Sequence, residues 1–428
     1  MTLRTLEYSC LAGSIALIGA DRIDLLGGTG SFRLPPFLVL AALGVFLRLA
    51  IIGLERRLFI FTTPPVRRQM PFLVVLVVFL FLASISTIFG LDPSRGLMQL
   101  TEVVLVSVLG YCVSVQIISQ PAGEKLIFRA VSLGLIVHLV FCIGQCIAWA
   151  YGFAPQDIDA PTGSGIATLF APSSSFFWVP RLSGSAIDPN GAGFTLVMYL
   201  VLLDAFVPKS RYTAVLRFAI ATFVLLSLSR SALLCWLAYF VFSQAFWRQL
   251  TFRRTVPWLI APTVLCSLLW VTHKNEIMDL VELWQVSDMI SARLSTGEGS
   301  SGGDHVQLIQ RGLETWSSST RTMIAGIGLG AEPRVLSDFF GDDKHGNFHC
   351  LYVTVLTGLG LPAFIVLMII FGYPIVGREG ATPGIAALAT FSLPYQAHTS
   401  PMFWLILAVL WAFKPKLRQQ PGVAPEMH

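Results

Sequence analysis

Long apolar runs, each close to the length of a membrane span, alternate with polar connections along most of the chain. A transmembrane helix needs about 20 predominantly apolar residues. We therefore predict an all-α integral membrane protein with about 12 transmembrane helices. The expected spans are residues 8–26, 35–54, 71–90, 97–119, 128–151, 191–207, 212–228, 231–247, 256–272, 350–376, 383–396 and 402–413. Eleven spans are the alternative, because the first run is short and only a tight turn separates the seventh from the eighth.

One long stretch, residues 273–348, is too polar to cross a bilayer, and we call it the cap. It holds seventeen charged side chains and three of the seven His. Apolar residues recur at helical spacing over 275–290, which predicts an amphipathic helix. A Gly/Ser hinge at 296–303 follows, and Asp304 is expected to be the N-cap of a helix running to about Met323.

The cap divides the chain into three parts. The predicted parts are residues 1–272 with nine spans and an outer loop at 152–190, the helical cap at 273–348, and residues 349–428 with the last three spans and a tail. The first apolar run leads into Asp21-Arg22-Ile23-Asp24 rather than into a small-residue cleavage site. We therefore expect it to remain as the first span.

Composition and charge support a membrane location. Apolar residues make up 54% of the chain, charged residues 12%, and the mean hydropathy is +0.71; a soluble domain carries about twice that share of charge. If the N-terminus is cytoplasmic, the inside segments hold 18 of the 29 Lys and Arg but six of the 24 Asp and Glu. The positive-inside rule then predicts cytoplasmic termini and an extracytoplasmic cap. We expect the lipid bilayer, and no nucleic acid, as a partner.

Three arginines lie in segments expected on the outer side. Arg181 is in RLSGSAIDPN before the sixth span, Arg230 is in LSLSRSALL between the seventh and eighth, and Arg311 is in LIQRGLETW within the cap. Guanidinium groups bind phosphate oxygens bidentately and stay charged, so three of them together could bind a diphosphate. The alternative for each is an interface anchor that contacts headgroups or a carboxylate.

Two histidines, His345 and His349, flank the entry to the tenth span. A satisfied interface residue is the alternative for each, and His138, inside the fifth span, is expected to be hydrogen-bonded within the bundle. The GIGLG segment at 326–330 follows a helix rather than a strand, which argues against dinucleotide binding. We expect it to form a close backbone turn that brings the cap to the membrane.

Four stretches resemble, in order and spacing, the O-antigen ligase and polymerase superfamily of bacterial membrane glycosyltransferases. They are RLSGSAIDPNGAG, LSLSRSALL, the R-x4-W and GIGLG run from Arg311, and HCLYVTVLTGLGLPAF from His349. The resemblance covers about Arg181 to Phe364 and the twelve-span layout. Three positions depart from the family pattern: Cys350 stands where Asn usually follows the His, Gly358 where an acidic residue is common, and Ala363 in place of a late Gly.

The resemblance implies a bacterial inner-membrane enzyme that uses a glycan on undecaprenyl diphosphate as donor and a lipid-linked or glycan hydroxyl as acceptor. Arg230 and Arg311 would hold the diphosphate, and His349 would deprotonate or position the acceptor. Arg181, Asn190 and His345 would bind substrate. Family members look metal-independent, and we expect no cofactor and no metal, although Asp342-Asp343 is a possible exception among the outer carboxylates.

The resemblance is compatible with two functions, and a third function does not depend on it. A ligase and a polysaccharide polymerase share all these features; the dominant outer loop favours a ligase slightly, while the 39-residue loop at 152–190 keeps a polymerase open. A multi-span transporter would need ionisable residues or broken helices near mid-bilayer. Most charges in this chain cluster at span ends, which argues against a transporter.

Overall fold

The computed structural model describes ten stretches of the chain. They are residues 2–25, 34–55, 64–120, 122–152, 170–172, 175–176, 179–246, 301–340, 346–375 and 379–412. The predicted ninth span at 256–272, the amphipathic cap helix at 275–290 and His345 lie outside these residues.

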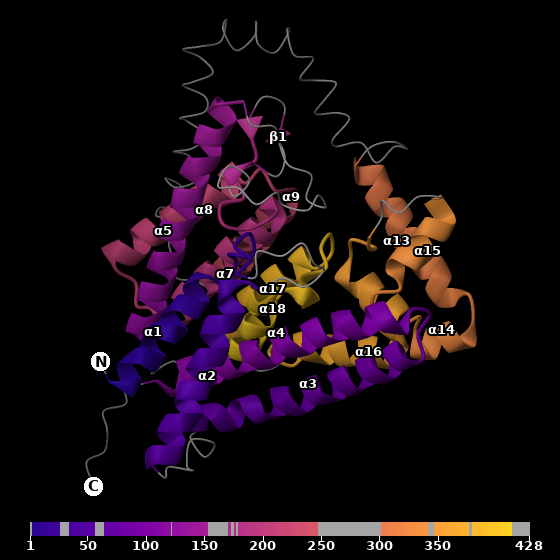
Figure 1. The fold of residues 1–428 in the computed structure, drawn as a ribbon, viewed down its shortest axis with the longest axis horizontal. Helices are drawn as coiled ribbons and strands as arrows, with labels where there is room; N and C mark the ends of the chain where they lie inside the picture. Colours follow the sequence, from indigo (N-terminus) through magenta and orange to yellow (C-terminus); the bar gives the residue numbers. More distant parts are fainter. Residues whose placement is uncertain are drawn as a thin grey trace, which may run out of the picture.

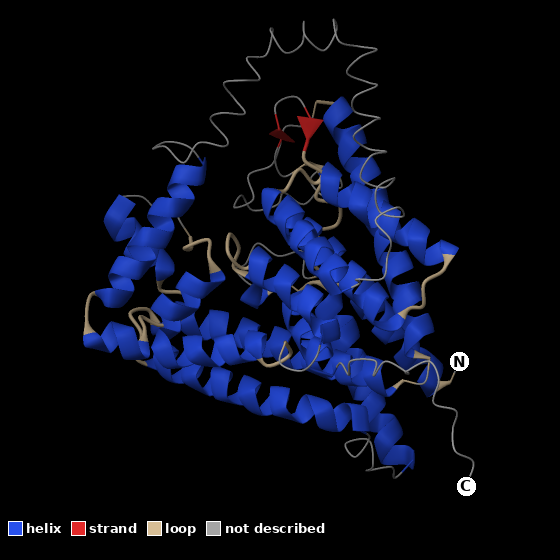
Figure 2. Cartoon of the chain, turned by 180° about the vertical axis from the view of Figure 1, so that it is seen from behind, coloured by secondary structure: helices blue, strands red, loops and turns tan. Residues whose placement is uncertain are grey.

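The described residues are almost entirely helical (Figures 1 and 2). The helices of the first two-thirds are α1 (Leu3–Ala16), α2 (Pro36–Glu55), α3 (Pro64–Ile88), α4 (Pro93–Ser119), α5 (Gly123–Ala150), α7 (Pro189–Phe206), α8 (Arg211–Leu226) and α9 (Arg230–Phe246). The later helices are α13 (Ser301–Ser317), α14 (Thr320–Ala325), α15 (Glu332–Phe340), α16 (Leu351–Gly372), α17 (Thr382–Phe391) and α18 (Pro401–Ala412), with short 3-10 turns at Glu379–Ala381 and Ala397–Thr399. Strands β1 (Ser175–Phe176) and β2 (Val179–Pro180) form a small antiparallel pair.

Each predicted span within the described residues coincides with a helix, but fewer of these helices are long enough to cross a membrane. Among the described residues, six combine sufficient length and apolar composition: α2, α3, α4, α5, α7 and α16. Helices α9, α17 and α18 are apolar but shorter. Two predicted spans end early: α1 stops at Ala16 and α17 at Phe391. The structure therefore bears out an all-helical membrane protein, and the count of about twelve spans remains a prediction.

Helix α18 lies in the centre of the bundle. Its residues from Met402 to Trp411 are at most 1% exposed, and it packs against α3, α4 and α7. A Cβ added at Gly110 of α4 would come within 2.9 Å of the Leu405 backbone nitrogen, so the two helices touch closely at that point. A helix that is apolar on all sides is typical of such an enclosed position.

The helix connections gather at two ends of the bundle. We call one of them the cap end. There the backbone N–H of Leu91 donates to the Ile327 carbonyl (2.7 Å), and the backbone N–H of Leu351 donates to the Ser392 carbonyl (2.9 Å). At the other, Glu7 lies 3.5 Å from Arg48, and the start of α5 faces the α7–α8 connection. We call this the basic end because Lys125, Arg129, Lys209 and Arg211 belong to it. Connections that alternate between two ends are what successive membrane spans require.

The GIGLG segment forms the close turn that its glycines predict. Gly326, Gly328 and Gly330 have φ of 72°, 95° and 71°, and a Cβ at Gly326 would lie 2.3 Å from the Gly358 carbonyl oxygen. The turn docks on a break in α16, where Gly360 has φ of 82° and Pro362 lacks an N–H. The carbonyls of Thr357 and Gly358 are thereby released from the helix, and they accept from the backbone N–H groups of Ile327 (2.9 Å) and Gly328 (2.8 Å).

The predicted cap helix from Asp304 to Met323 is wrong in its bounds. Helix α13 already includes Ser301 and ends at Ser317, and α14 begins after Ser319. Ser319 makes a capping box with Thr322, in which the Ser319 hydroxyl accepts from the Thr322 N–H at 3.1 Å. The run of serines at the end of α13 offers several alternative N-caps for a new helix. The helix therefore breaks at these serines and does not continue unbroken to Met323.

Glu332, in the first turn of α15, gives a pH-dependent prediction. The side chain is 2% exposed, and burial raises its pKa from 4.5 to about 7, although Arg95 and backbone amides oppose the change. The folded state then holds a proton that the unfolded state loses, so stability falls as pH rises from about 4.5 to about 7. We expect Glu332→Gln to raise the free energy of unfolding by about 3 kcal/mol at pH 8 and to change little at pH 4.

The measurement is thermal unfolding in detergent between pH 4 and pH 8. Asp338→Asn, an exposed change on the same helix, is the control and should follow the wild-type curve. A wild-type pH dependence in Glu332→Gln would contradict the prediction.

Candidate functional site

Three of the predicted site residues lie together at the cap end. The Arg181 Nε donates to the Ser227 carbonyl at 3.4 Å, and the Ser229 hydroxyl donates to the Asn190 Oδ1 at 2.6 Å. Arg230 follows directly as the first residue of α9, and it is exposed. The segment before α7 and the turn between α8 and α9 therefore form one polar group, which carries Arg181, Asn190 and Arg230.

The α8–α9 turn is held by its own serines. Leu228 adopts a positive φ of 49°, which is uncommon for a residue with a side chain. The Ser227 hydroxyl accepts from the Ser229 N–H at 3.3 Å, and the Ser229 hydroxyl accepts from the Ala232 N–H at 3.1 Å. Ser229 thus acts as the N-cap of α9 and fixes Arg230 at the start of the helix.

Residues that the sequence analysis did not single out hold the 183–187 segment from beneath. Arg22, in the turn after α1, donates to the Ala186 carbonyl (3.2 Å), the Ser183 hydroxyl (3.0 Å) and the carbonyls of Ala171 and Ile187. From α5, the Gln145 amide donates to the Gly184 carbonyl (3.1 Å) and accepts from the Gly184 N–H (3.1 Å). Their signal in the sequence was a polar residue at the end of, or inside, an apolar run.

His138 packs beneath the same segment. It is 5% exposed, its ring lies 5.0 Å from the Phe223 ring, and a Cβ added at Gly184 would approach its Nδ1 to 2.1 Å. The expected hydrogen bonding is not complete, because within the described part of the chain its Nε2 has no partner. His138 acts as a packing surface for the Gly184 turn.

Asp188 joins this group to the connection between α17 and α18. Its carboxylate caps α7 by accepting from the N–H groups of Asn190 (2.7 Å) and Gly191 (3.0 Å), and it accepts from the Tyr395 hydroxyl at 3.0 Å. The charge of Asp188, together with burial, raises the pKa of Tyr395. The next residue, Gln396, donates to Thr354 near the start of α16. Residues 392–400 therefore bridge the starts of α7 and α16.

Arg311 and His349 belong to a second group, on the α16 side of that bridge. Helix α13 packs on α16, where the Thr357 hydroxyl donates to the Gly312 carbonyl at 2.9 Å. Arg311, beside Gly312, is half-buried, with one Nη 3.4 Å from the Glu314 carboxylate. His349 directly precedes the N-cap of α16, so Arg311 and His349 belong to neighbouring elements.

His349 has an unusual backbone and a second histidine beside it. Its φ is 52°, and its N–H donates to the Asn347 Oδ1 at 2.8 Å. The His305 ring of α13 meets the His349 ring edge to face, with centroids 4.6 Å apart. A non-glycine residue at positive φ is worth attention as a functional position. His305 was not singled out from the sequence because a lone histidine in a polar helix carries no signal there.

Cys350, Gly358 and Ala363 lie at the start of α16 or within it. Cys350 is the N-cap of α16 without a side-chain cap, and the first N–H of that helix bonds Ser392 instead. The Gly358 carbonyl also accepts from the Ser86 hydroxyl at 2.7 Å, and Ala363 is fully buried. Within the described ranges, no cluster of three or more His, Cys, Asp or Glu could hold a metal ion.

Comparison of the chain with models of protein families finds no match, and comparison with curated proteins finds none either.

Proposed function

We propose that this protein is a membrane glycosyltransferase that moves a glycan from an undecaprenyl-diphosphate carrier to an acceptor hydroxyl, as O-antigen ligases do. The observation that carries the proposal is the polar group of Arg181, Asn190 and Arg230, built into the cap end of a bundle whose core is apolar. A lipid diphosphate needs cations at the end of membrane spans, where its headgroup lies.

In the proposed reaction, the acceptor oxygen forms a bond to the anomeric carbon as the bond from that carbon to the diphosphate breaks. His349 takes the proton of the acceptor hydroxyl, and undecaprenyl diphosphate leaves. Arg230 and Arg311 stabilise the charge that develops on the diphosphate, with Arg181, Asn190 and His345 binding substrate. Fixed guanidinium groups in a water-poor site are suited to this task.

The proposed setting is a bacterial inner membrane, with the basic end and both termini in the cytoplasm and the cap outside. The second candidate is a polymerase that extends a lipid-linked chain with the same donor. The break in α16 is a feature that transporters use for substrate binding. Here, however, the GIGLG turn occupies the released carbonyls of Thr357 and Gly358, which favours the transferase.

The test is a reconstituted reaction with purified protein, a lipid-linked glycan donor and either a lipid A–core acceptor or more lipid-linked glycan. We expect release of undecaprenyl diphosphate and transfer that persists in a metal chelator. Glycan on the separate acceptor identifies a ligase, and a ladder of longer lipid-linked chains identifies a polymerase. No release with either acceptor, from protein that elutes as a folded species, would contradict the proposal.

A further inference from the structure

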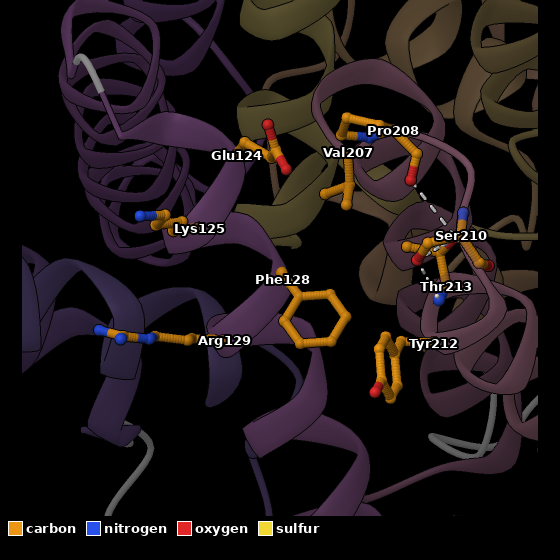
Figure 3. A pocket seen from close by; sticks show the side chains of 9 residues that line it. All are labelled: Glu124, Lys125, Phe128, Arg129, Val207, Pro208, Ser210, Tyr212 and Thr213. Atoms are coloured by element: carbon orange, nitrogen blue, oxygen red, sulfur yellow. Dashed lines mark hydrogen bonds between the residues drawn. The ribbon is translucent and has the colours of Figure 1, made fainter.

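A pocket of about 250 Å³ lies at the basic end, between the start of α5 and the α7–α8 connection (Figure 3). The residues that line it are Glu124, Lys125, Phe128, Arg129, Val207, Pro208, Ser210, Tyr212 and Thr213. The candidate site described above lies at the opposite end of the bundle, so this pocket has no part in the proposed transfer. It opens at the first turn of α5, a helix long and apolar enough to span a membrane, and the end of such a helix is where lipid headgroups would lie.

Two aromatic side chains and one acidic side chain face the pocket, beside the smaller Val207, Pro208, Ser210 and Thr213. Phe128 of α5 and Tyr212 of α8 turn their rings toward each other across it, and Glu124, one turn before Phe128, extends toward Val207 and Pro208 (Figure 3). The Glu124 side chain is exposed, and no hydrogen bond or ion pair from another described residue engages its carboxylate. A carboxylate beside two aromatic rings is the combination that binds an ammonium group, through charge pairing and cation–π attraction.

The cations lie around the pocket rather than inside it. Lys125 and Arg129 point away from it (Figure 3), and the Arg129 guanidinium lies 5.8 Å from the centre of the Tyr8 ring. The Arg211 guanidinium lies 5.0 Å from the centre of the Tyr212 ring and donates to the Tyr212 hydroxyl at 3.0 Å. A rim of guanidinium and ammonium groups fits a phosphate next to the pocket.

An apolar surface continues from the pocket along α8. Tyr212 is 60% exposed, and Val215 and Phe218, at successive steps of three residues, are 66% and 62% exposed. Side chains three residues apart lie on the same face of a helix. An acyl chain can therefore lie along α8 below a headgroup held in the pocket.

We propose that this pocket binds phosphatidylethanolamine. The ammonium group of the lipid lies between Glu124 and the rings of Phe128 and Tyr212, its phosphate contacts Arg211, and an acyl chain follows the exposed face of α8. Phosphatidylglycerol carries the same phosphate but no ammonium group. Its phosphate would contact the cations around the pocket, but it would offer Glu124 no cationic partner. The carboxylate therefore sets the preference between the two lipids.

The test is native mass spectrometry of the delipidated full-length protein titrated with phosphatidylethanolamine or phosphatidylglycerol of equal chain length. We expect the wild type to prefer phosphatidylethanolamine. Glu124→Gln should bind it about tenfold more weakly, the size of one charge-assisted contact, and should lose the preference. Tyr212→Leu, at an exposed position, should also weaken binding and provides the test if Glu124→Gln does not fold.

Tyr151→Leu is the matched control, because Tyr151 is an 81% exposed aromatic residue at the other end of α5. It should bind both lipids as the wild type does. Equal binding of the two lipids by the wild type, a preference for phosphatidylglycerol, or an unchanged preference in both Glu124→Gln and Tyr212→Leu would each overturn the proposal.

Discussion

Replacing Arg311 with alanine is expected to abolish glycan transfer, and replacing it with lysine is expected to slow transfer by about tenfold to a hundredfold. Lysine keeps the charge but loses the forked geometry that contacts two phosphate oxygens. One charge-assisted hydrogen bond is worth about 1.5–3 kcal/mol, which corresponds to that range of rates if the contact acts mainly in the transition state. The measurement is release of undecaprenyl diphosphate by purified variants.

The fold should be little affected by this change. The Arg311–Glu314 pair is partly exposed, at 33% and 49% for the two side chains, and such pairs contribute about 0–1 kcal/mol to stability. Arg321→Ala is the control, because Arg321 is an exposed arginine of the cap whose guanidinium bonds the Phe89 carbonyl at 2.7 Å. Wild-type transfer by Arg311→Ala would show that Arg311 is an interface anchor.

The helices could be predicted from the sequence because each apolar run is long and bounded by polar residues. Pairs such as Asp92-Pro93 and Asp188-Pro189 also mark helix starts, since the aspartate caps the helix and proline is tolerated in its first turn. The central place of α18 was not predicted. Its apolar run looks like any other span, and hydropathy cannot tell a helix enclosed by protein from one that faces lipid.

The sequence singled out charged residues of the candidate site, but not the residues that support them. Arg181 and Arg230 stood out as cations next to apolar runs. Arg22 and Gln145 did not, because their partners are distant in the chain: Arg22 and Ser183 are 161 residues apart. No periodicity or spacing rule connects positions so far apart. Their polar character in an apolar setting indicated that partners exist, and the structure shows which they are.

The site depends most on the turn at Gly184, and Gly184→Ala is expected to destabilise the protein strongly. Gly184 has φ of 55°, a conformation that costs a residue with a side chain about 1–2 kcal/mol. The added methyl group would also lie 2.1 Å from the His138 Nδ1, and overpacking of this kind costs about 1–3 kcal/mol. We expect a loss of about 3 kcal/mol in the free energy of unfolding, together with loss of transfer as the 183–187 segment moves.

Three further variants, Gly53→Ala, His138→Ala and the double variant Gly184→Ala/His138→Ala, separate these causes. Gly53→Ala is the control for the substitution itself, because nothing lies within 4 Å of a Cβ at that position in α2, and an alanine inside a helix is as good as or better than a glycine. The double variant Gly184→Ala/His138→Ala removes the imidazole that the methyl group would meet. It should recover the part of the stability loss that comes from the contact of the methyl group with the imidazole. The part that comes from the positive φ should remain, because the effects of substitutions at two residues in contact are not additive. Thermal unfolding of the wild type, Gly184→Ala, His138→Ala and the double variant gives the coupling directly, and strictly additive losses would show that His138 does not support the Gly184 turn.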